Sequence, residues 1–374
     1  MSVLDALAPV VSETVGPQAA RIDREGVFPA EAVAALAEAG LLGLISSPDV
    51  GGMGHGPRQA AAVVEELARH CASTAMVVTM HYCGTAVIEA HGPDDVRKRI
   101  AAGEYLTTLA FSEAGSRSMF WAPTSTATPA GGDGVAARLD ARKSWVTSAG
   151  QAAGYVWSSR PLAADGLSTI WLVPAGSPGL SVGPSFDGLG LRGNESRPMA
   201  ADGVLVGADA MLGPDGGGLD VMLGTVLPWF QVLNAACSVG LADAATGRAA
   251  AHVAATRYEH LDQSLAENLV TRSTVARMRV KTDAASALLG DTLAAMEAGR
   301  PDTMLRVLEA KAVAGEAATE VTDLGMRACG GAAFRKEVGV ERAFRDARAA
   351  TVMAPTTDAL YDFIGRAVCG LPVF

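Results

Sequence analysis

The sequence predicts a multi-domain α+β protein in which a helical region, a β-rich region and a second helical region follow one another. Two observations predict it. Apolar residues repeat at helical spacing in 1–105 and 213–374, whereas 106–212 holds short apolar runs between Gly, Pro and Asp clusters. The 374 residues are 49% hydrophobic, enough for a large core. We expect an N-terminal α-helical domain (1–105), a middle β-barrel or β-sandwich domain (106–212) and a C-terminal helical bundle (213–374).

Individual elements follow from apolar periodicity and from Gly and Pro signals. Phe28-Pro29 opens the first clear helix, and Gly51–Gly54 is a loop because glycine tolerates backbone conformations that other residues avoid. The expected helices are 30–42, 58–69, 226–256, 269–298 and 304–329. The expected strands include 169–173 and 203–206.

Charge and composition exclude several classes of function. A formal net charge of −10 argues against nucleic-acid binding, which needs a basic surface. No 18-residue apolar run is present, so we expect no membrane span, and the first 20 residues do not resemble a signal peptide. The 5 cysteines are far apart and the 6 histidines form no ligand motif, so we expect buried free thiols and no metal site. These features predict a cytoplasmic protein.

Four segments, in order, are similar to motifs of the acyl-CoA dehydrogenases. They are Gly51-Gly52-Met53-Gly54 with the helix around Val63–Arg69, Phe111–Ser118, Lys143–Ala149, and Cys329-Gly330-Gly331 with Val340–Arg348. The resemblance covers nearly the whole chain. It implies that family's fold, with a C-terminal four-helix bundle, and a homotetramer or homodimer that binds FAD between the β-domain and the C-terminal helices.

Matching positions assign flavin-binding residues by resemblance. Around the isoalloxazine ring they are Ser112, Ser118, Trp145 and Thr147, and around the adenosine and pyrophosphate they are Arg257, Gly330, Gly331 and Thr356. Hydroxyl donors would stabilise the negative charge of a reduced flavin. Each residue also has an ordinary structural interpretation: a turn serine, a strand-core tryptophan or a surface arginine. The surroundings of Arg257 depart from the family, since Leu261 replaces a glycine and Asn268 a glutamine.

The catalytic base of the family is missing. Dehydrogenation of an acyl thioester needs a carboxylate to remove the α-proton. The two positions where family members carry that glutamate are Ala354 and Phe230, and the arginine that follows the second is Gln231. By resemblance, Phe230, Gln231 and Arg192 would contact substrate, Arg192 through its bidentate guanidinium.

Replacement bases are His81, Tyr82, Asp358 and Glu259. An imidazole titrates near neutral pH, which suits a base, although a lone histidine is more often a hydrogen-bonded structural residue.

Three functions stay open. The first is FAD-dependent dehydrogenation of an acyl thioester on CoA or a carrier protein, with an unusual base, an electron-transfer partner and a biosynthetic role. The second is a monooxygenase that takes reduced FMN or FAD from a flavin reductase and reacts it with oxygen. The third is a non-catalytic flavin-binding or partner protein.

Overall fold

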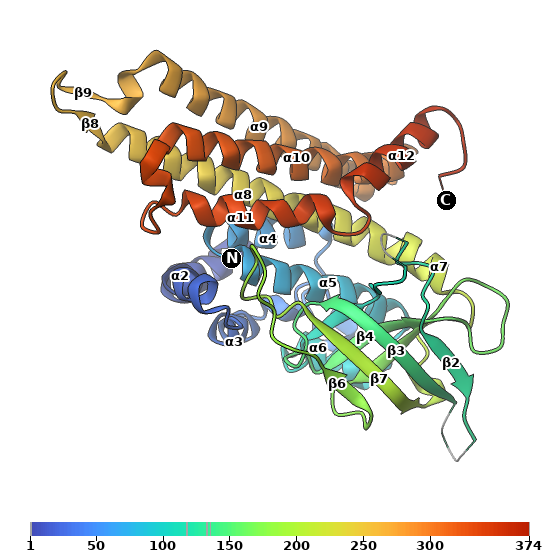
Figure 1. Cartoon of the computed structure of the whole chain (residues 1–374). Coiled ribbons are helices and arrows are strands. Elements are labelled where there is room, and N and C mark those ends of the chain that lie inside the picture. The colour runs from blue at the N-terminus through green and yellow to red at the C-terminus, as the bar shows by residue number, and fades with distance from the viewer. Residues whose placement is uncertain (1, 117–118, 132–133, 135, 374) are drawn as a thin grey trace. The chain divides into compact units, whose positions relative to one another are not determined.

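The computed structural model describes residues 2–116, 119–131, 134 and 136–373 (Figure 1). Helices come first, strands follow, and helices return, so the predicted α+β fold class is confirmed. The chain divides into two compact units. One comprises Met1–Ala60, Met76–Asp187 and Arg192–Phe230, and the other Ala61–Ala75, Gly188–Leu191 and Gln231–Phe374.

The element bounds are as follows. The α-helices are α1 (Val3–Val10), α2 (Gly16–Glu25), α3 (Ala30–Glu38), α4 (Pro57–His70), α5 (Ala72–His91), α6 (Asp94–Ala101), α7 (Gly218–Val221), α8 (Leu227–Ala255), α9 (Leu269–Ala298), α10 (Thr303–Cys329), α11 (Val340–Val352) and α12 (Thr357–Val368). The strands are β1 (Thr107–Ala110), β2 (Thr126–Pro129), β3 (Ala137–Val146), β4 (Gly154–Ser159), β5 (Thr169–Pro174), β6 (Leu180–Val182), β7 (Arg197–Val206), β8 (Arg257–Tyr258) and β9 (Gln263–Ser264).

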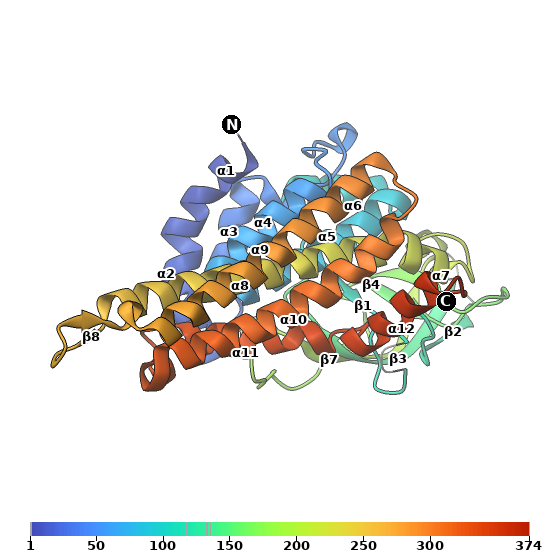
Figure 2. The same cartoon turned by 90° about the horizontal axis from the view of Figure 1, so that it is seen from above.

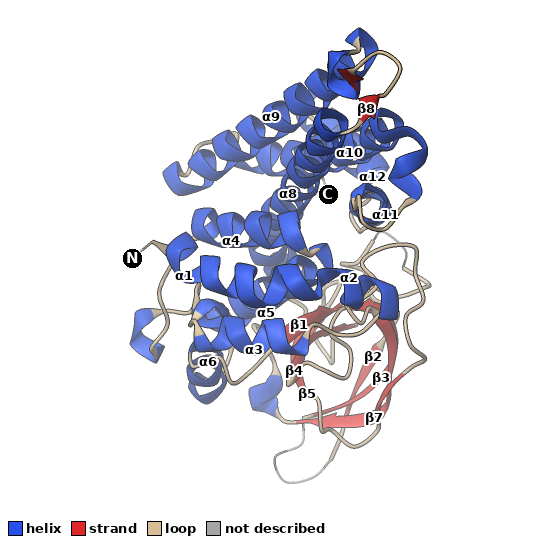
Figure 3. Ribbon diagram, turned by 90° about the vertical axis from the view of Figure 1, so that its left-hand side faces the viewer, coloured by secondary structure: helices blue, strands red, loops and turns tan. Residues whose placement is uncertain are grey.

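The first unit contains a β-sandwich, which settles the predicted choice between barrel and sandwich. One sheet has the order β1-β4-β5 and the other β2-β3-β7-β6 (Figure 3). Leu139 of β3 and Val204 of β7 share one fully buried core with Trp157 of β4 and Trp171 of β5. Along the first six residues of β3 the burial alternates, so that Ala137, Leu139 and Ala141 point inward and the charged residues between them point outward. The predicted strands lie within β5 and β7.

The second unit is built on long helices. α10 packs against α9, α11 and α12, and Figure 2 shows α9 and α10 side by side. α9 spans the predicted 269–298, because Asn268 caps its first N–H groups and Gly299 ends it at a left-handed φ of 59°. The other predicted bundle helices are confirmed to within two residues, as α8 and α10.

Two glycines of the N-terminal region determine the local backbone: Gly40 follows the end of α3, and Gly52 lies in the predicted loop. The predicted helix 30–42 is shorter than expected: α3 ends at Glu38, and Gly40 turns the chain with a φ of 74°. The expected loop around Gly52 is present. A Cβ on Gly52 would lie 2.1 Å from the carbonyl oxygen of Ser46, so only glycine fits there.

One helical segment bears on the membrane prediction. Gly218–Ala255 is long and apolar enough to cross a membrane, contrary to the expectation that the sequence holds no such stretch. However, 67% of its most apolar window is buried inside the protein. That burial is typical of a core helix, which is apolar because it packs on all sides.

Candidate functional site

The end of β3 presents an exposed tryptophan in an unusual backbone conformation. Trp145 has a φ of 56° and is 66% exposed. The register with β7 shifts between Lys143 and Val146, which turns the indole outward. Phe186 lies edge-on to it, with ring centroids 6.0 Å apart. A bulky residue at positive φ is rare and points to a functional surface.

Hydroxyl groups accompany this indole. The Ser144 N–H donates to the Ser112 carbonyl oxygen over 2.8 Å, which fixes the segment carrying Ser112 beside the strand end. Thr147 is buried, and its Oγ1 lies 3.2 Å from Ser196 Oγ. Three predicted ring contacts, Ser112, Trp145 and Thr147, therefore come from one region of the sandwich. The fourth, Ser118, lies outside the described residues.

A buried ion pair supports this region and was assigned no role from sequence. Lys143 Nζ lies 2.6 Å from Glu113 Oε1, and the two side chains are 0% and 1% exposed. Lys143 also donates to the Ser158 carbonyl oxygen over 2.7 Å, while Thr124 and Ser125 donate to the carboxylate. Burial lowers the pKa of Lys143 to about 8, against the pull of Glu113. Although burial alone would raise it, Lys143 and the hydroxyls hold the Glu113 pKa below its usual value.

His81 and Tyr82 hold the fold, which argues against the predicted role of either as base. The Thr107 N–H donates to His81 Nδ1 over 3.2 Å, so Nε2 carries the proton and donates to the Leu42 carbonyl oxygen over 3.0 Å. Burial lowers the His81 pKa to about 4. The Tyr82 hydroxyl donates to the Leu41 carbonyl oxygen over 2.7 Å, and burial raises its pKa. Neither side chain has an accessible atom left to accept a proton from substrate.

In the second unit, a buried lysine fixes the loop that carries Ala354. Lys311 of α10 is fully buried, and its Nζ donates to the carbonyl oxygens of Met353 (3.0 Å) and Pro355 (2.7 Å). Burial alone lowers its pKa to about 7. Sequence reasoning missed this contact, although a single lysine inside the apolar stretch of α10 was a signal.

The same loop faces buried amides of α8. Asn234 Nδ2 donates to Met353 Sδ over 3.3 Å. Gln231, one helical turn earlier, is 0% exposed. Phe230, the other predicted base position, is half-buried and is the last residue of the Arg192–Phe230 segment of the first unit. Two carboxylates remain as possible bases: Asp358 is exposed in the first turn of α12, and Glu259 is exposed in the β8–β9 hairpin.

The residues predicted to hold the adenosine and pyrophosphate also lie in the second unit. Arg257 is exposed in the β8–β9 hairpin and forms a 2.7 Å ion pair with Asp262. Gly330 and Gly331 follow α10 and are exposed, and a Cβ on either would meet no atom within 4 Å. Thr356 caps α12, its Oγ1 accepting from the Ala359 N–H over 3.3 Å.

Arg192, the predicted substrate or phosphate contact, has partners in its own unit. Its Nε donates to the Asp23 carbonyl oxygen over 2.8 Å, and its Nη1 lies 2.8 Å from Asp187 Oδ1. These contacts tie the loop after β6 to the end of α2. Any anion at Arg192 would have to compete with Asp187.

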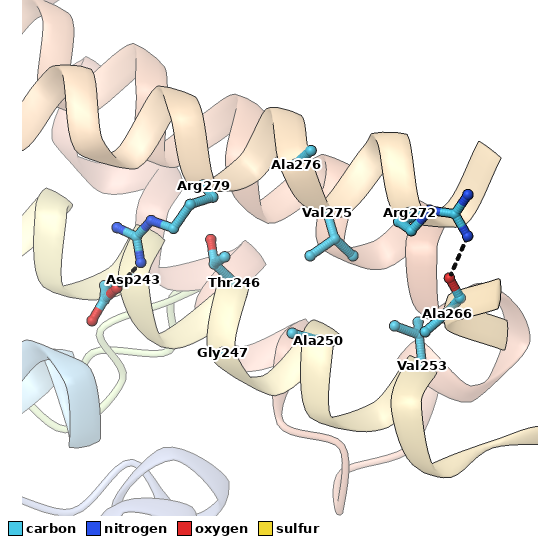
Figure 4. A pocket seen from close by; sticks show the side chains of 10 residues that line it. All are labelled: Asp243, Thr246, Gly247, Ala250, Val253, Ala266, Arg272, Val275, Ala276 and Arg279. Carbon is cyan, nitrogen blue, oxygen red and sulfur yellow. Dashed lines mark hydrogen bonds and ion pairs between the residues drawn. The ribbon is translucent and has the colours of Figure 1, made fainter. Parts of the chain in front are cut away.

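A pocket opens between α8 and α9, where apolar side chains form most of the wall (Figure 4). At one end Arg279 pairs with Asp243 over 2.7 Å, and at the other Arg272 donates to the Ala266 carbonyl oxygen. Asp243, the one carboxylate of the lining, also pairs with Arg69 over 2.9 Å. The Asp243 carboxylate is thus occupied by two arginines, and the printed partners of Arg272 are backbone carbonyl oxygens, so the pocket is not a candidate for the reactive centre.

The histidines, cysteines and acidic residues of the described part of the chain form no cluster of the kind that holds a metal ion. Among the residues that the structure describes, no three of them are placed to share a metal ion. All 5 cysteines are free; Cys71, Cys83, Cys237 and Cys329 are buried and Cys369 is exposed.

Comparison with known proteins identifies the class. Three family profiles match in order: the N-terminal domain (2–104), middle domain (108–204) and C-terminal domain (216–369) of acyl-CoA dehydrogenases. The fold and these matches thus define a flavoprotein oxidoreductase. The chain belongs to the acyl-CoA dehydrogenase family, which confirms the resemblance seen in its motifs.

Individual relatives agree. Probable acyl-CoA dehydrogenase FadE25 of Mycobacterium tuberculosis (strain ATCC 25618 / H37Rv) is 27% identical, over 97% of this chain and 93% of its own length. The fold matches butyryl-CoA dehydrogenase from Megasphaera elsdenii with a TM-score of 0.91 at 22% identity, over 98% of this chain and 97% of that one. It also matches the prolyl acyl carrier protein oxidase AnaB with a TM-score of 0.88 at 17% identity, over 98% of each chain.

Removal of the exposed indole tests its assignment. We expect Trp145→Ala to weaken flavin binding about tenfold, because an aromatic contact is worth roughly 1 kcal/mol beyond its buried area. The measurement is flavin released on dilution of the purified protein. Leu205→Ala is the matched control, since Leu205 is an exposed apolar residue of β7 in the same sheet. Equal flavin retention in both variants would contradict the assignment.

Proposed function

We propose that this protein uses FAD to dehydrogenate an acyl thioester carried on CoA or a carrier protein, and that its proton acceptor is not at the usual family positions. The observation that carries the proposal is Trp145, held outward at positive φ with hydroxyl-bearing residues beside it. This donor set fits a flavin ring, because the indole supplies a flat apolar wall and hydroxyls can donate to the polar edge.

The residues of the sandwich would hold the ring. Bound FAD supplies the acceptor for the hydride that leaves the β-carbon. Trp145 would cover one face of the ring and exclude water, while Ser112 and Thr147 would offer donors to its polar edge. The buried Glu113–Lys143 pair keeps the strand end in position. Arg257, Gly330, Gly331 and Thr356 are proposed for the adenosine and pyrophosphate.

The α-proton needs a different acceptor in this chain. Ala354 and Phe230 cannot bind a proton, and His81 and Tyr82 are committed to backbone carbonyls. We assign the role to Asp358, an exposed carboxylate in the first turn of α12, four positions after Ala354. Glu259 is the other candidate, on a hairpin far along the chain from that loop.

The carrier of the thioester and the protein that accepts the electrons are also proposed. Gln231 replaces a cation on the substrate side, and Arg192 is already paired with Asp187. Weaker binding of the CoA phosphates favours a thioester on a carrier protein and a biosynthetic role. The structural neighbour AnaB is named as an oxidase of a prolyl acyl carrier protein. We further propose a homotetramer or homodimer in the cytoplasm that passes its electrons to a partner flavoprotein.

The visible spectrum of the purified protein tests this function. We expect bound oxidised FAD that loses its colour when one member of an acyl-thioester panel is added without oxygen. The panel presents each acyl group on CoA and on a carrier protein. A colourless protein that binds only reduced flavin would overturn the proposal in favour of a monooxygenase, and failure to bind flavin in either state would favour a non-catalytic role.

The proposed base has its own test. Asp358→Asn should slow anaerobic flavin reduction about 10²–10⁴-fold, the usual contribution of a general base. Flavin content should stay unchanged, because Asp358 is exposed and lies outside the proposed ring contacts. Glu259→Gln is the matched control and should reduce at the normal rate. The opposite pattern would assign the base to Glu259.

A further inference from the structure

We propose that Gln231 and Asn234 form a hydrogen-bonding site for a hydroxyl group on the acyl chain, so that the preferred substrate is a hydroxyacyl thioester. The inference rests on the proposed function, because only an acyl-thioester substrate bound as in the family would put its acyl chain beside the loop around Ala354. It goes beyond that function by naming the class of acyl group and the side chains that select it.

The observation is a pair of buried amides with free hydrogen-bonding atoms. Gln231 is 0% exposed, and neither its Oε1 nor its Nε2 has a partner among the described residues. Asn234 is 1% exposed, and its Oδ1 is unpartnered within the same described part of the chain. Buried side-chain amides are normally hydrogen-bonded, so such an exception requires an explanation.

The two amides share one face of α8, and Asn234 contacts the Ala354 loop. Residues three apart on a helix are neighbours. Asn234 Nδ2 donates to Met353 Sδ over 3.3 Å, and a thioether sulfur is a weak acceptor. This contact uses the amide nitrogen of Asn234 and leaves its amide oxygen without a partner among the residues that the structure describes. On the same loop, Lys311 Nζ is occupied by the Met353 and Pro355 carbonyl oxygens. The loop is therefore fixed by α10, and the unpartnered amide atoms belong to α8.

The free atoms select a neutral group that both donates and accepts. Two amide oxygens can accept, and the NH₂ of Gln231 can donate. A hydroxyl can donate to an oxygen and accept from the NH₂ at once. A carboxylate cannot donate, so it would be repelled by the two oxygens. A plain alkyl chain would leave all three groups unpaired, and sites built to hydrogen-bond a hydroxyl reject analogues that lack it.

Binding of short pantetheine thioesters tests the site, since pantetheine is common to CoA and carrier proteins. Calorimetry on the flavin-loaded protein compares butyryl-pantetheine with 2- and 3-hydroxybutyryl-pantetheine. We expect at least one hydroxyacyl compound to bind about tenfold or more tightly than butyryl. Gln231→Met, close in shape and without polar atoms, should remove the preference, because an alkyl chain then no longer leaves the Gln231 amide unpaired. Asn234→Leu should reduce the preference.

Thr246→Val is the matched control on α8, because the Thr246 hydroxyl donates to the Ala242 carbonyl oxygen of its own helix. It should keep the full preference. Equal binding of all three thioesters by the unmodified protein, or an unchanged preference in Gln231→Met, would overturn the site. A preference without any anaerobic bleaching would retain the site and reject the proposed dehydrogenation, so the two failures are distinguishable.

Discussion

Glu113→Gln is expected to destabilise the protein by about 3–5 kcal/mol at neutral pH, the usual effect of removing one partner from a buried ion pair. The ammonium of Lys143 would then lie in the sandwich core without a counter-charge. Its remaining contacts, the carbonyl oxygens of Phe111 and Ser158 and the hydroxyl of Ser158, are neutral. Burial of an uncompensated charge is among the largest single effects on stability.

The double variant separates the charge from its burial. Glu113→Gln with Lys143→Met removes both charges, so it should recover most of the loss of the single variant. Urea unfolding followed by tryptophan fluorescence measures the free energy of unfolding of each variant. Trp157 reports on this region, because its ring centroid lies 5.4 Å from Lys143 Nζ. Flavin binding should fall with the single change, since Trp145 follows Lys143 by two positions on β3.

An exposed pair of the same sheet is the control. Arg142 and Asp202 are 2.6 Å apart, but their side chains are 69% and 60% exposed. Asp202→Asn should change the unfolding free energy by less than about 1 kcal/mol. Equal effects of Glu113→Gln and Asp202→Asn would show that the buried pair does not hold the strand end.

Lys311 is expected to make the protein more stable as the pH rises from about 7 to 10. In the folded protein, burial lowers the pKa of Lys311 to about 7, whereas an ordinary lysine has a pKa of 10.5. Between these values the unfolded chain binds more protons than the folded one, so the free energy of unfolding increases with pH. The gain approaches 1.4 kcal/mol per pH unit, or roughly 3–5 kcal/mol over the window.

The hydrogen bonds of Lys311 persist when the proton leaves. A neutral amine keeps two N–H groups, which is enough for the carbonyl oxygens of Met353 and Pro355. Deprotonation therefore removes the cost of a buried charge without releasing the loop. Below pH 7 the folded protein carries that charge, and the contribution of Lys311 to stability is at its lowest.

Lys311→Met isolates this contribution. As the pH rises from about 7 to 10, the free energy of unfolding of the unmodified protein should increase relative to that of the variant. Lys281→Met is the control: Lys281 on α9 is 39% exposed and pairs with Glu320, so its difference should stay nearly constant. A constant difference for Lys311→Met as well would mean that the lysine titrates as an ordinary one.

The sequence by itself determined the fold class and the family. Helical periodicity placed α9 at 269–298, because periodicity is a local signal, and the structure adds that Asn268 and Gly299 end it. Four ordered motifs identified the acyl-CoA dehydrogenase family, and the same alignment of motifs showed Ala354 and Phe230 where a glutamate is usual. Such features lie within short segments, so they can be read without knowing which segments meet.

The tertiary structure alone decided what the polar residues do. His81 looked like a base, yet backbone groups from two other segments occupy both its ring nitrogens. Lys143 and Lys311 became buried charges only when residues 30 and 42 positions away in the chain folded against them. The role of a titratable side chain depends on burial and on its partners, and both are set by contacts between segments that are distant in sequence.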